Sequence, residues 1–157
     1  MKKIVALTLV LVCLLALVAC GKNDPTQLGT SDFTIVLPEG YAMSFDNMEQ
    51  DQVAYFYKDD ESIDFDVYQW AKGDIFTLEA EANYYAAEYG TTAEAVTVNG
   101  INGYKYVSIE EYEGHTYTVV NYMFEDDTHI VEICFWTVGS AEEYEDVNDI
   151  INTLEKK

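Results

Sequence analysis

Arginine is absent from this chain of 157 residues, and lysine is scarce. Eight lysines stand against 29 acidic residues, which gives a formal net charge of −21 at pH 7. A surface of this charge repels nucleic acid and anionic lipid headgroups. Without arginine, the chain also lacks the bidentate clamp that usually holds phosphate or carboxylate ligands. We therefore expect no nucleic-acid partner. A basic protein, cations or a glycan remain as partners that such a surface accepts, and a second interpretation is that the charge only keeps an exported domain soluble.

The chain also lacks an apolar run of the length that a typical membrane-spanning helix needs, which is about 20 residues. Its longest apolar run, Ile4–Ala19, has 16 residues. This run follows Lys2 and Lys3 and leads into the sequence Leu-Val-Ala-Cys, which ends at Cys20. A basic start, a short apolar run and a small-residue exit are typical of a cleaved leader. The pattern resembles the signal peptide and lipobox of bacterial lipoproteins, whose cysteine receives a diacylglycerol thioether and becomes the first residue after cleavage.

The lipoprotein resemblance implies a signal peptide over residues 1–19, lipid attachment at Cys20, and a location at the extracytoplasmic side of the cell membrane. One acyl chain holds a protein only marginally, whereas two chains give stable attachment. Two other interpretations stay open for the same residues. One is an ordinary secretory signal with a chance cysteine, and the other is a short membrane helix that is not cleaved.

Cysteine is rare in the rest of the chain. If Cys13 leaves with the leader and Cys20 carries lipid, Cys134 remains alone, so an internal disulfide cannot form. Cys134 lies within the apolar run Ile133–Trp136, which favours a buried packing residue over a nucleophile. We expect residues 20–32 to be a flexible polar tether and residues 33–157 to be a single acidic α+β domain. Loss of Lys2 and Lys3 leaves six lysines and a formal charge of −23.

Apolar and polar residues alternate along most of this domain, which predicts strands separated by turns. A helix is predicted over Leu78–Tyr89, with Thr77 as its N-cap, and a second helix follows a capping box formed by Ser140 and Glu143. The strand at His129–Thr137 is apolar on both faces, so we expect it to be central and covered twice. The sequence therefore predicts an α+β fold with about seven mostly antiparallel strands, flanked by a helix on each face.

Two turn motifs resemble those of the PsbP-like proteins and their DcrB-like relatives. The stretch Phe33–Tyr41 is similar to their first strand with its LPxGY exit, and Asn99–Tyr104 is similar to their NGxxGY hairpin. The resemblance implies an antiparallel sheet between helices and no shared catalytic residues, since the relatives are mainly binding, assembly or accessory proteins. None of the metal-ligand residues of PsbP itself can be matched in this chain.

Residues that could carry catalysis or hold a metal are few. His115 and His129 are predicted beside turns, and the sequence contains no nucleophile elbow or glycine-rich phosphate loop. The acidic clusters at residues 59–61 and 110–113 lack the spacing of an EF-hand. We therefore predict no catalytic residue, no metal site and no cofactor.

One predicted strand has a face that is both acidic and aromatic. In the segment Ile63–Trp70, alternate residues share a face, which groups Asp64, Asp66, Tyr68 and Trp70 opposite three apolar side chains. Carboxylates beside aromatic rings can hold sugars or cationic side chains. A second interpretation is that a helix covers this face, with Asp64 and Asp66 near an exposed end. We take these four residues as the candidate ligand-binding face.

The function predicted from these features is that of a membrane-anchored, non-enzymatic binding or assembly module with a monomeric domain. Two alternatives remain at this point. One is an envelope-stress or structural accessory protein, and the other is an enzyme of unknown class.

Overall fold

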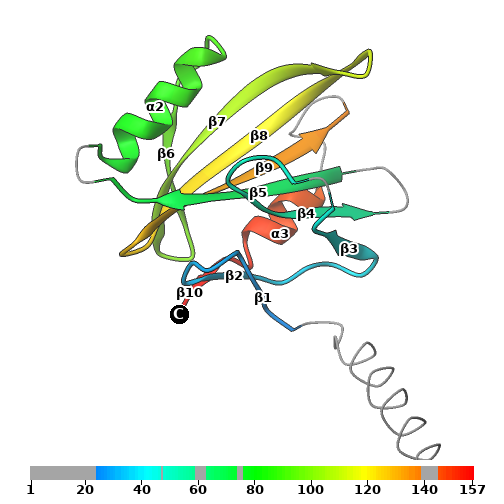
Figure 1. Ribbon diagram of the computed structural model, residues 1–157, viewed down its shortest axis with the longest axis horizontal. Helices are drawn as coiled ribbons and strands as arrows, with labels where there is room; N and C mark the ends of the chain where they lie inside the picture. The colour runs from blue at the N-terminus through cyan, green and yellow to red at the C-terminus, as the bar shows by residue number, and fades with distance from the viewer. Residues whose placement is uncertain (1–23, 47, 59–62, 74–75, 139–144) are drawn as a thin grey trace, which may run out of the picture.

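The computed structural model describes residues 24–46, 48–58, 63–73, 76–138 and 145–157. Its main element is a seven-stranded sheet in which every neighbouring pair is antiparallel, in the order β3-β4-β5-β9-β8-β7-β6 (Figure 1). The strands are β3 (Tyr41–Ser44), β4 (Gln52–Lys58), β5 (Ile63–Ala71), β6 (Glu94–Val98), β7 (Ile101–Tyr112), β8 (His115–Glu125) and β9 (His129–Thr137). The predicted antiparallel sheet is thus confirmed, and β9 is its central strand.

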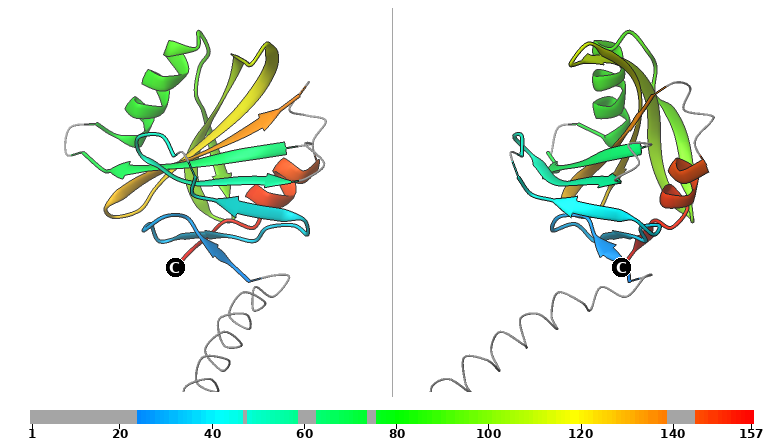
Figure 2. Two further views of the ribbon diagram at one scale, coloured as in Figure 1. Left: turned by 45° about the vertical axis from the view of Figure 1, so that its right-hand side comes forward. Right: turned by 90° about the vertical axis from the view of Figure 1, so that its right-hand side faces the viewer.

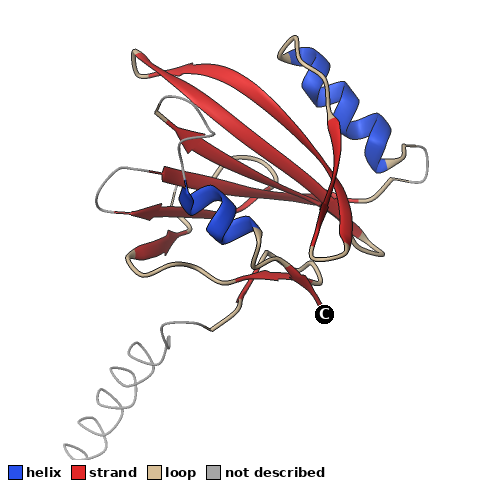
Figure 3. Ribbon diagram, turned by 180° about the vertical axis from the view of Figure 1, so that it is seen from behind, coloured by secondary structure: helices blue, strands red, loops and turns tan. Residues whose placement is uncertain are grey.

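Two helices lie on opposite faces of this sheet, as the side view in Figure 2 shows. Helix α2 (Leu78–Glu88) begins as predicted, because the Thr77 hydroxyl accepts a hydrogen bond from the Ala80 N–H at 3.2 Å. Helix α3 (Glu145–Ile151) crosses the other face, nearest the viewer in Figure 3. The predicted capping box at Ser140 and Glu143 lies outside the described residues.

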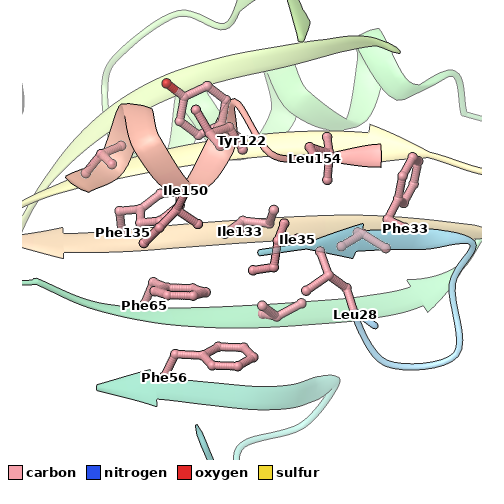
Figure 4. Close-up of a cluster of buried hydrophobic side chains, with 14 of the residues drawn as sticks. Leu28, Phe33, Ile35, Phe56, Phe65, Tyr122, Ile133, Phe135, Ile150 and Leu154 are labelled. Carbon is pink, nitrogen blue, oxygen red and sulfur yellow. The ribbon is translucent and has the colours of Figure 1, made fainter. Parts of the chain in front are cut away.

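The larger apolar core lies between the sheet and α3. Phe56, Phe65 and Phe135 form a continuous row of rings across three strands, with centroids 4.5 and 5.0 Å apart. Ile150 of α3 is fully buried against this row, as Figure 4 shows. This face therefore contains tightly packed apolar side chains of the kind that stabilise a fold.

A second, three-stranded sheet closes the same core, and the sequence did not predict it. It consists of β1 (Thr26–Gln27), β2 (Phe33–Ile35) and β10 (Glu155–Lys156), in the order β1-β2-β10. Leu28 is 0% exposed, and the Gln69 side chain donates to the Thr30 hydroxyl and accepts from the Thr30 N–H, both at 2.8 Å.

One prediction is corrected by this sheet. The expected tether over residues 20–32 extends too far, since folded structure begins by Thr26. At the other end of the chain, Lys156 pairs with Phe33 in the small sheet. Strands of two residues have no detectable period, and their pairing partners lie far away along the chain. The sequence pattern of residues 20–32 therefore could not reveal that β1 lies within the expected tether.

The motif Asn99–Tyr104 forms the hairpin between β6 and β7, and the backbone geometry there requires both of its glycines. Asn99 and Gly100 have φ angles of 50° and 82°, which is the left-handed geometry that a tight hairpin turn requires. A Cβ atom on Gly103 would lie 2.5 Å from both the Met123 carbonyl oxygen and the Phe124 ring. The Asn99 amide also donates to the Leu154 carbonyl at 3.1 Å, so this turn holds the C-terminal segment in place.

Of the cysteines discussed above, only Cys134 lies in the part of the chain that the structure describes. Cys134 is a free, buried cysteine, as expected, and burial raises the pKa of its thiol well above the usual range. Cys20 and the predicted signal peptide lie outside the described residues. Within the described part of the chain, no helix is long and apolar enough to cross a membrane.

Candidate functional site

A cleft of about 1000 Å³ lies on the sheet face opposite α3. Helix α2 covers the β7–β8 side of this face and packs on it through Leu78, Ala82 and Ala86. Asp46 and residues 49–52, from the loop before β4 and the start of that strand, line the opposite side of the cleft. The helix is therefore displaced toward one end of the sheet, and strands β5 and β9 form the floor of the cleft.

The lining of the cleft is acidic and aromatic. Among the described lining residues there is no lysine or histidine. The acidic residues are Asp46, Glu49, Asp51, Asp64, Asp66, Glu81, Glu110 and Glu132. The aromatic residues are Tyr55, Tyr68, Trp70, Tyr85, Tyr89, Tyr106, Tyr112, Tyr117 and Trp136. Carboxylates and ring faces both attract positive charge, so most of the lining favours a cationic ligand.

All four residues of the predicted ligand-binding face lie in this cleft. The alternation of β5 directs Asp64, Asp66, Tyr68 and Trp70 toward it, while Phe65 points into the core below the sheet. This face is neither fully open nor fully covered by a helix, because α2 covers only part of it. Asp66 is 8% exposed, so it does not lie at an exposed end of the strand. That the four residues bind a ligand stays a prediction.

Asp66 is held at the centre of the floor by two side-chain donors. Gln52 donates its amide to Asp66 Oδ1 at 2.5 Å, and the Trp136 indole N–H donates to Oδ2 at 2.7 Å. Burial raises the pKa of Asp66 to about 6, although both hydrogen bonds favour the charged form and the Glu49 and Asp64 charges oppose it. The carboxyl group is therefore oriented, and its charge responds to pH near neutrality.

Glu132 is the second buried acid of the floor, on β9, where it pairs with Tyr68 of β5. It is 7% exposed and accepts a hydrogen bond from the Tyr106 hydroxyl at 2.5 Å. Burial raises the pKa of Glu132 to about 7; the Tyr106 bond lowers it and the nearby Glu110 charge raises it. Glu132 could not be recognised from the sequence, because it stands within an apolar strand and only the neighbouring strand β5 has an alternating polar pattern.

Asp64 differs from the other two acids of the floor in its hydrogen bonding. The Tyr55 hydroxyl donates to Asp64 Oδ2 at 2.5 Å, and burial together with this carboxylate raises the pKa of Tyr55 above its usual range. Asp64 Oδ1 is buried and has no hydrogen-bond partner within the part of the chain that the structure describes. A buried acceptor without a donor costs free energy, which sets Asp64 apart from the fully bonded Asp66.

The two aromatic residues of β5 have different surroundings. The Trp70 ring packs on the Tyr85 ring of α2 at 5.8 Å and joins the smaller apolar cluster under the helix. Tyr68 is half-buried in the floor, and burial raises the pKa of its hydroxyl above the usual range. Trp70 therefore contributes partly to packing, whereas Tyr68 is the better probe of a binding role.

The histidines lie away from the cleft lining. His129 Nδ1 is 3.7 Å from Asp126 Oδ1, beside the turn between β8 and β9. Asp126 accepts from the backbone N–H groups of Thr128 and His129 and, through its other oxygen, from that of Asp32. No group of three or more potential metal ligands occurs among the described residues. Asp126 acts in the structure as an anchor for backbone donors.

Comparison with known proteins supports the fold but no particular activity. No protein-family model matches the chain, and a search of curated proteins finds no match either. A solved structure from Bacteroides thetaiotaomicron is similar at a TM-score of 0.63 and 16% identity, over 87% of this chain and 49% of that one. This chain thus spans about half the length of that relative.

The solution structure of the cyanobacterial PsbP protein of Synechocystis, CyanoP, is also similar. The TM-score is 0.63 at 12% identity, over 88% of this chain and 96% of that chain. Similarity at this level of identity establishes the fold alone. The fold is PsbP-like α+β, as the two turn motifs predicted.

Proposed function

We propose that this chain is a lipid-anchored, extracytoplasmic module that binds a ligand in the cleft beside α2 without transforming it. The observation that carries this proposal is the combination of a sizeable cleft with a lining of oriented carboxylates and aromatic rings. A volume of about 1000 Å³ is sufficient for a drug-sized ligand. The PsbP-like fold fits an accessory or binding role, and it imposes no chemistry of its own.

The anchor is proposed from the leader sequence. Attachment of diacylglycerol at Cys20 would hold the domain at the membrane surface through the few residues that precede β1. Replacing Cys20 by Ala should abolish lipid attachment, and intact mass measurement of the membrane fraction tests this. A mature chain that starts elsewhere, or an unmodified Cys20, would contradict the anchor and leave the cleft unaffected.

The binding role is tested by thermal shift against a panel of organic cations, neutral oligosaccharides and divalent metal ions. The full chain in nonionic detergent should be stabilised by members of one class. The stabilisation should disappear when Tyr68 is changed to Leu and Asp64 to Asn, and it should persist after Glu79→Gln and Glu94→Gln, which alter exposed acids outside the cleft. If no class stabilises the protein, or if the cleft variant responds like the parent, the proposal fails.

An enzyme is the second candidate, and one observation favours it. Glu132 and Asp66, with pKa values raised to about 7 and about 6, resemble carboxyl groups tuned for proton transfer. Both carboxyl groups, however, already accept hydrogen bonds from side chains of the protein. Such bonds hold a carboxyl group in place as an acceptor and favour a binding role over proton transfer. Product analysis of every stabilising compound after prolonged incubation separates the two, since turnover that stops in Glu132→Gln would replace the binding proposal.

A further inference from the structure

Within the cleft, the negative charges are distributed and have no basic side chain between them. Asp64, Asp66 and Glu132 lie on the floor, Glu81 on α2, and Asp51 beside the start of β4. No described lysine lines the cleft; Lys72, for example, lies 2.8 Å from Glu125. A ligand with a single positive charge would neutralise only one of these positions.

The register of the sheet keeps the carboxylates of the floor apart. Asp66 pairs with Cys134, and Tyr68 pairs with Glu132, so the two buried acids are diagonal neighbours with a ring and a thiol at the other corners. Diagonal neighbours of this kind are about 7–8 Å apart at their backbone positions. This arrangement suits separated positive charges joined by an apolar chain more closely than it suits one compact ion.

Aromatic rings occupy the space between and around the acids. The Tyr117 and Trp136 rings meet edge to face at 5.8 Å, and Tyr89 stacks on Tyr106 at 6.2 Å. Ring faces accept methylene groups by apolar contact and ammonium groups by cation–π attraction. The lining therefore alternates surfaces for charge with surfaces for an alkyl chain.

We propose that the cleft binds a linear alkyl chain carrying two or more ammonium groups, which lie beside the separated carboxylates of Asp64, Asp66 and Glu132. This inference rests on the proposed binding function and specifies its ligand class. The chemistry is shared by free polyamines and by the side chains of a lysine-rich peptide. A polyamine would lie along the floor between Asp64 and Glu132, and α2 would contact it from the side.

Isothermal titration calorimetry on the full chain in nonionic detergent at pH 8 tests the ligand class. The probes are spermidine, a lysine pentapeptide, butylamine as a single ammonium, and MgCl₂ as a compact dication. Spermidine or the peptide should bind with a Kd below roughly 1 mM, and butylamine should bind about tenfold more weakly or not at all. Excess MgCl₂ at constant ionic strength should not displace the bound probe. The tighter of the two multivalent probes identifies the source of the ammonium groups.

Matched variants locate the binding. Asp64→Asn with Asp66→Asn should weaken spermidine or peptide binding by about tenfold or more, because hydrogen bonds to charged partners are lost. Glu79→Gln with Glu94→Gln removes the same formal charge outside the cleft and should change the Kd less than about twofold. Tyr68→Leu keeps apolar bulk and should weaken binding by roughly threefold through loss of the ring face. Circular dichroism of each variant establishes that it is folded. If the variant with Asp64→Asn and Asp66→Asn unfolds, the variant that combines Tyr68→Leu with Asp64→Asn replaces it.

The inference is overturned if neither multivalent probe binds, or if both bind the cleft variants as tightly as the parent. A neutral oligosaccharide that binds in the cleft while the ammonium probes fail would end this inference and leave the proposed function standing. Failure of every class in the panel would end both.

Discussion

The two faces of the main sheet are built from the same strands but have opposite chemistry. On the α3 face, Phe65 is 0% exposed within a row of stacked rings, and α3 and the small sheet cover it. On the α2 face, the next residue of β5, Asp66, lies in the floor of a cleft and accepts two hydrogen bonds. One face therefore stabilises the fold, and the other presents oriented polar groups.

This contrast shows how a small α+β domain can place its apolar core and a polar cleft on opposite faces of one sheet. Because successive side chains of a strand point to opposite faces, β5 and β9 contribute to the core and to the cleft at once. Buried acids such as Asp66 and Glu132 cost free energy, and the apolar packing on the opposite face offsets that cost. Substitutions on the two faces should therefore differ in their effect on stability.

The largest difference should appear when one aromatic side chain is truncated on each face. Phe65→Ala removes a fully buried ring that packs on Phe56 and Phe135, and it should lower the free energy of unfolding by about 3–5 kcal/mol. Tyr68→Ala, on the cleft face, should cost less than about 1.5 kcal/mol. Urea unfolding followed by circular dichroism measures both. Equal losses would show that the cleft face is a second core.

A smaller loss is expected when the anchor at the edge of the α3 face is removed. Asp126 accepts from three backbone N–H groups, including that of Asp32 at 3.0 Å, and Asp126→Ala should cost about 2–3 kcal/mol.

The pKa of Asp126 supports a pH test of the same anchor. Burial alone would raise this pKa, but the backbone hydrogen bonds of Thr128, Asp32 and His129 lower it to about 2. A lowered carboxyl pKa gives stability that is present above the unfolded value, near 4, and is lost as the pH falls toward 2. Urea unfolding of parent and variant at pH 6 and pH 3 checks this, and an unchanged difference between the two pH values would contradict it.

Much of this contrast could be predicted from the sequence, and the missing parts have definite physical reasons. The alternation in β5 separated Asp64 and Asp66 from Phe65, and the apolar strand β9 indicated its central place. Glu132 was missed because a single acid in an apolar run carries no period. The cleft itself was missed because it depends on where α2 rests along the sheet, which the helix sequence does not encode.

The small sheet was missed for a different reason. Leu28 stands alone among polar residues, so its burial depends on strand pairing with distant parts of the chain. Polar composition predicted a tether where long-range hydrogen bonds produce structure. The turn Asn99–Gly100 was predictable because its chemistry is local.

A still smaller change in stability is expected from Glu132, a buried acid in the floor of the cleft. Because burial raises the pKa of Glu132 from 4.5 to about 7, the folded state holds more protons than the unfolded state between these values. Stability contributed by this site therefore falls as the pH rises from about 4.5 to 7. The groups that face Glu132 are Tyr106, Glu110, Tyr85, Tyr89, Cys134 and Tyr68.

Glu132→Gln should accordingly raise stability at pH 8 by about 1–2 kcal/mol and leave it nearly unchanged at pH 4.5. Thermal unfolding at the two pH values measures the difference. Glu94→Gln, an exposed acid on β6, is the control and should show no such pH dependence. A destabilisation of Glu132→Gln at pH 8 would mean that the charged carboxylate stabilises the cleft face.

The smallest expected effect concerns the charge of the molecule as a whole. Crowded negative charges repel one another, and salt screens them. Raising NaCl from 20 to 300 mM should increase the melting temperature by roughly 2–4 °C, and CaCl₂ should be more effective at equal ionic strength. Differential scanning calorimetry tests this, and a flat or falling response would show that the charges are too dispersed to matter.

The central claim, that the α2 face is a binding cleft for multivalent ammonium chains, can be tested through the two tryptophans. Trp70 and Trp136 both line the cleft, and they are the only tryptophans in the chain. Titrating ¹⁵N-labelled protein with spermidine while recording the two indole N–H signals therefore observes the cleft alone. We predict that the Trp136 signal moves most, because its N–H donates to Asp66, and that both signals saturate together. Spermidine binding seen by calorimetry without movement of either indole signal would contradict the account.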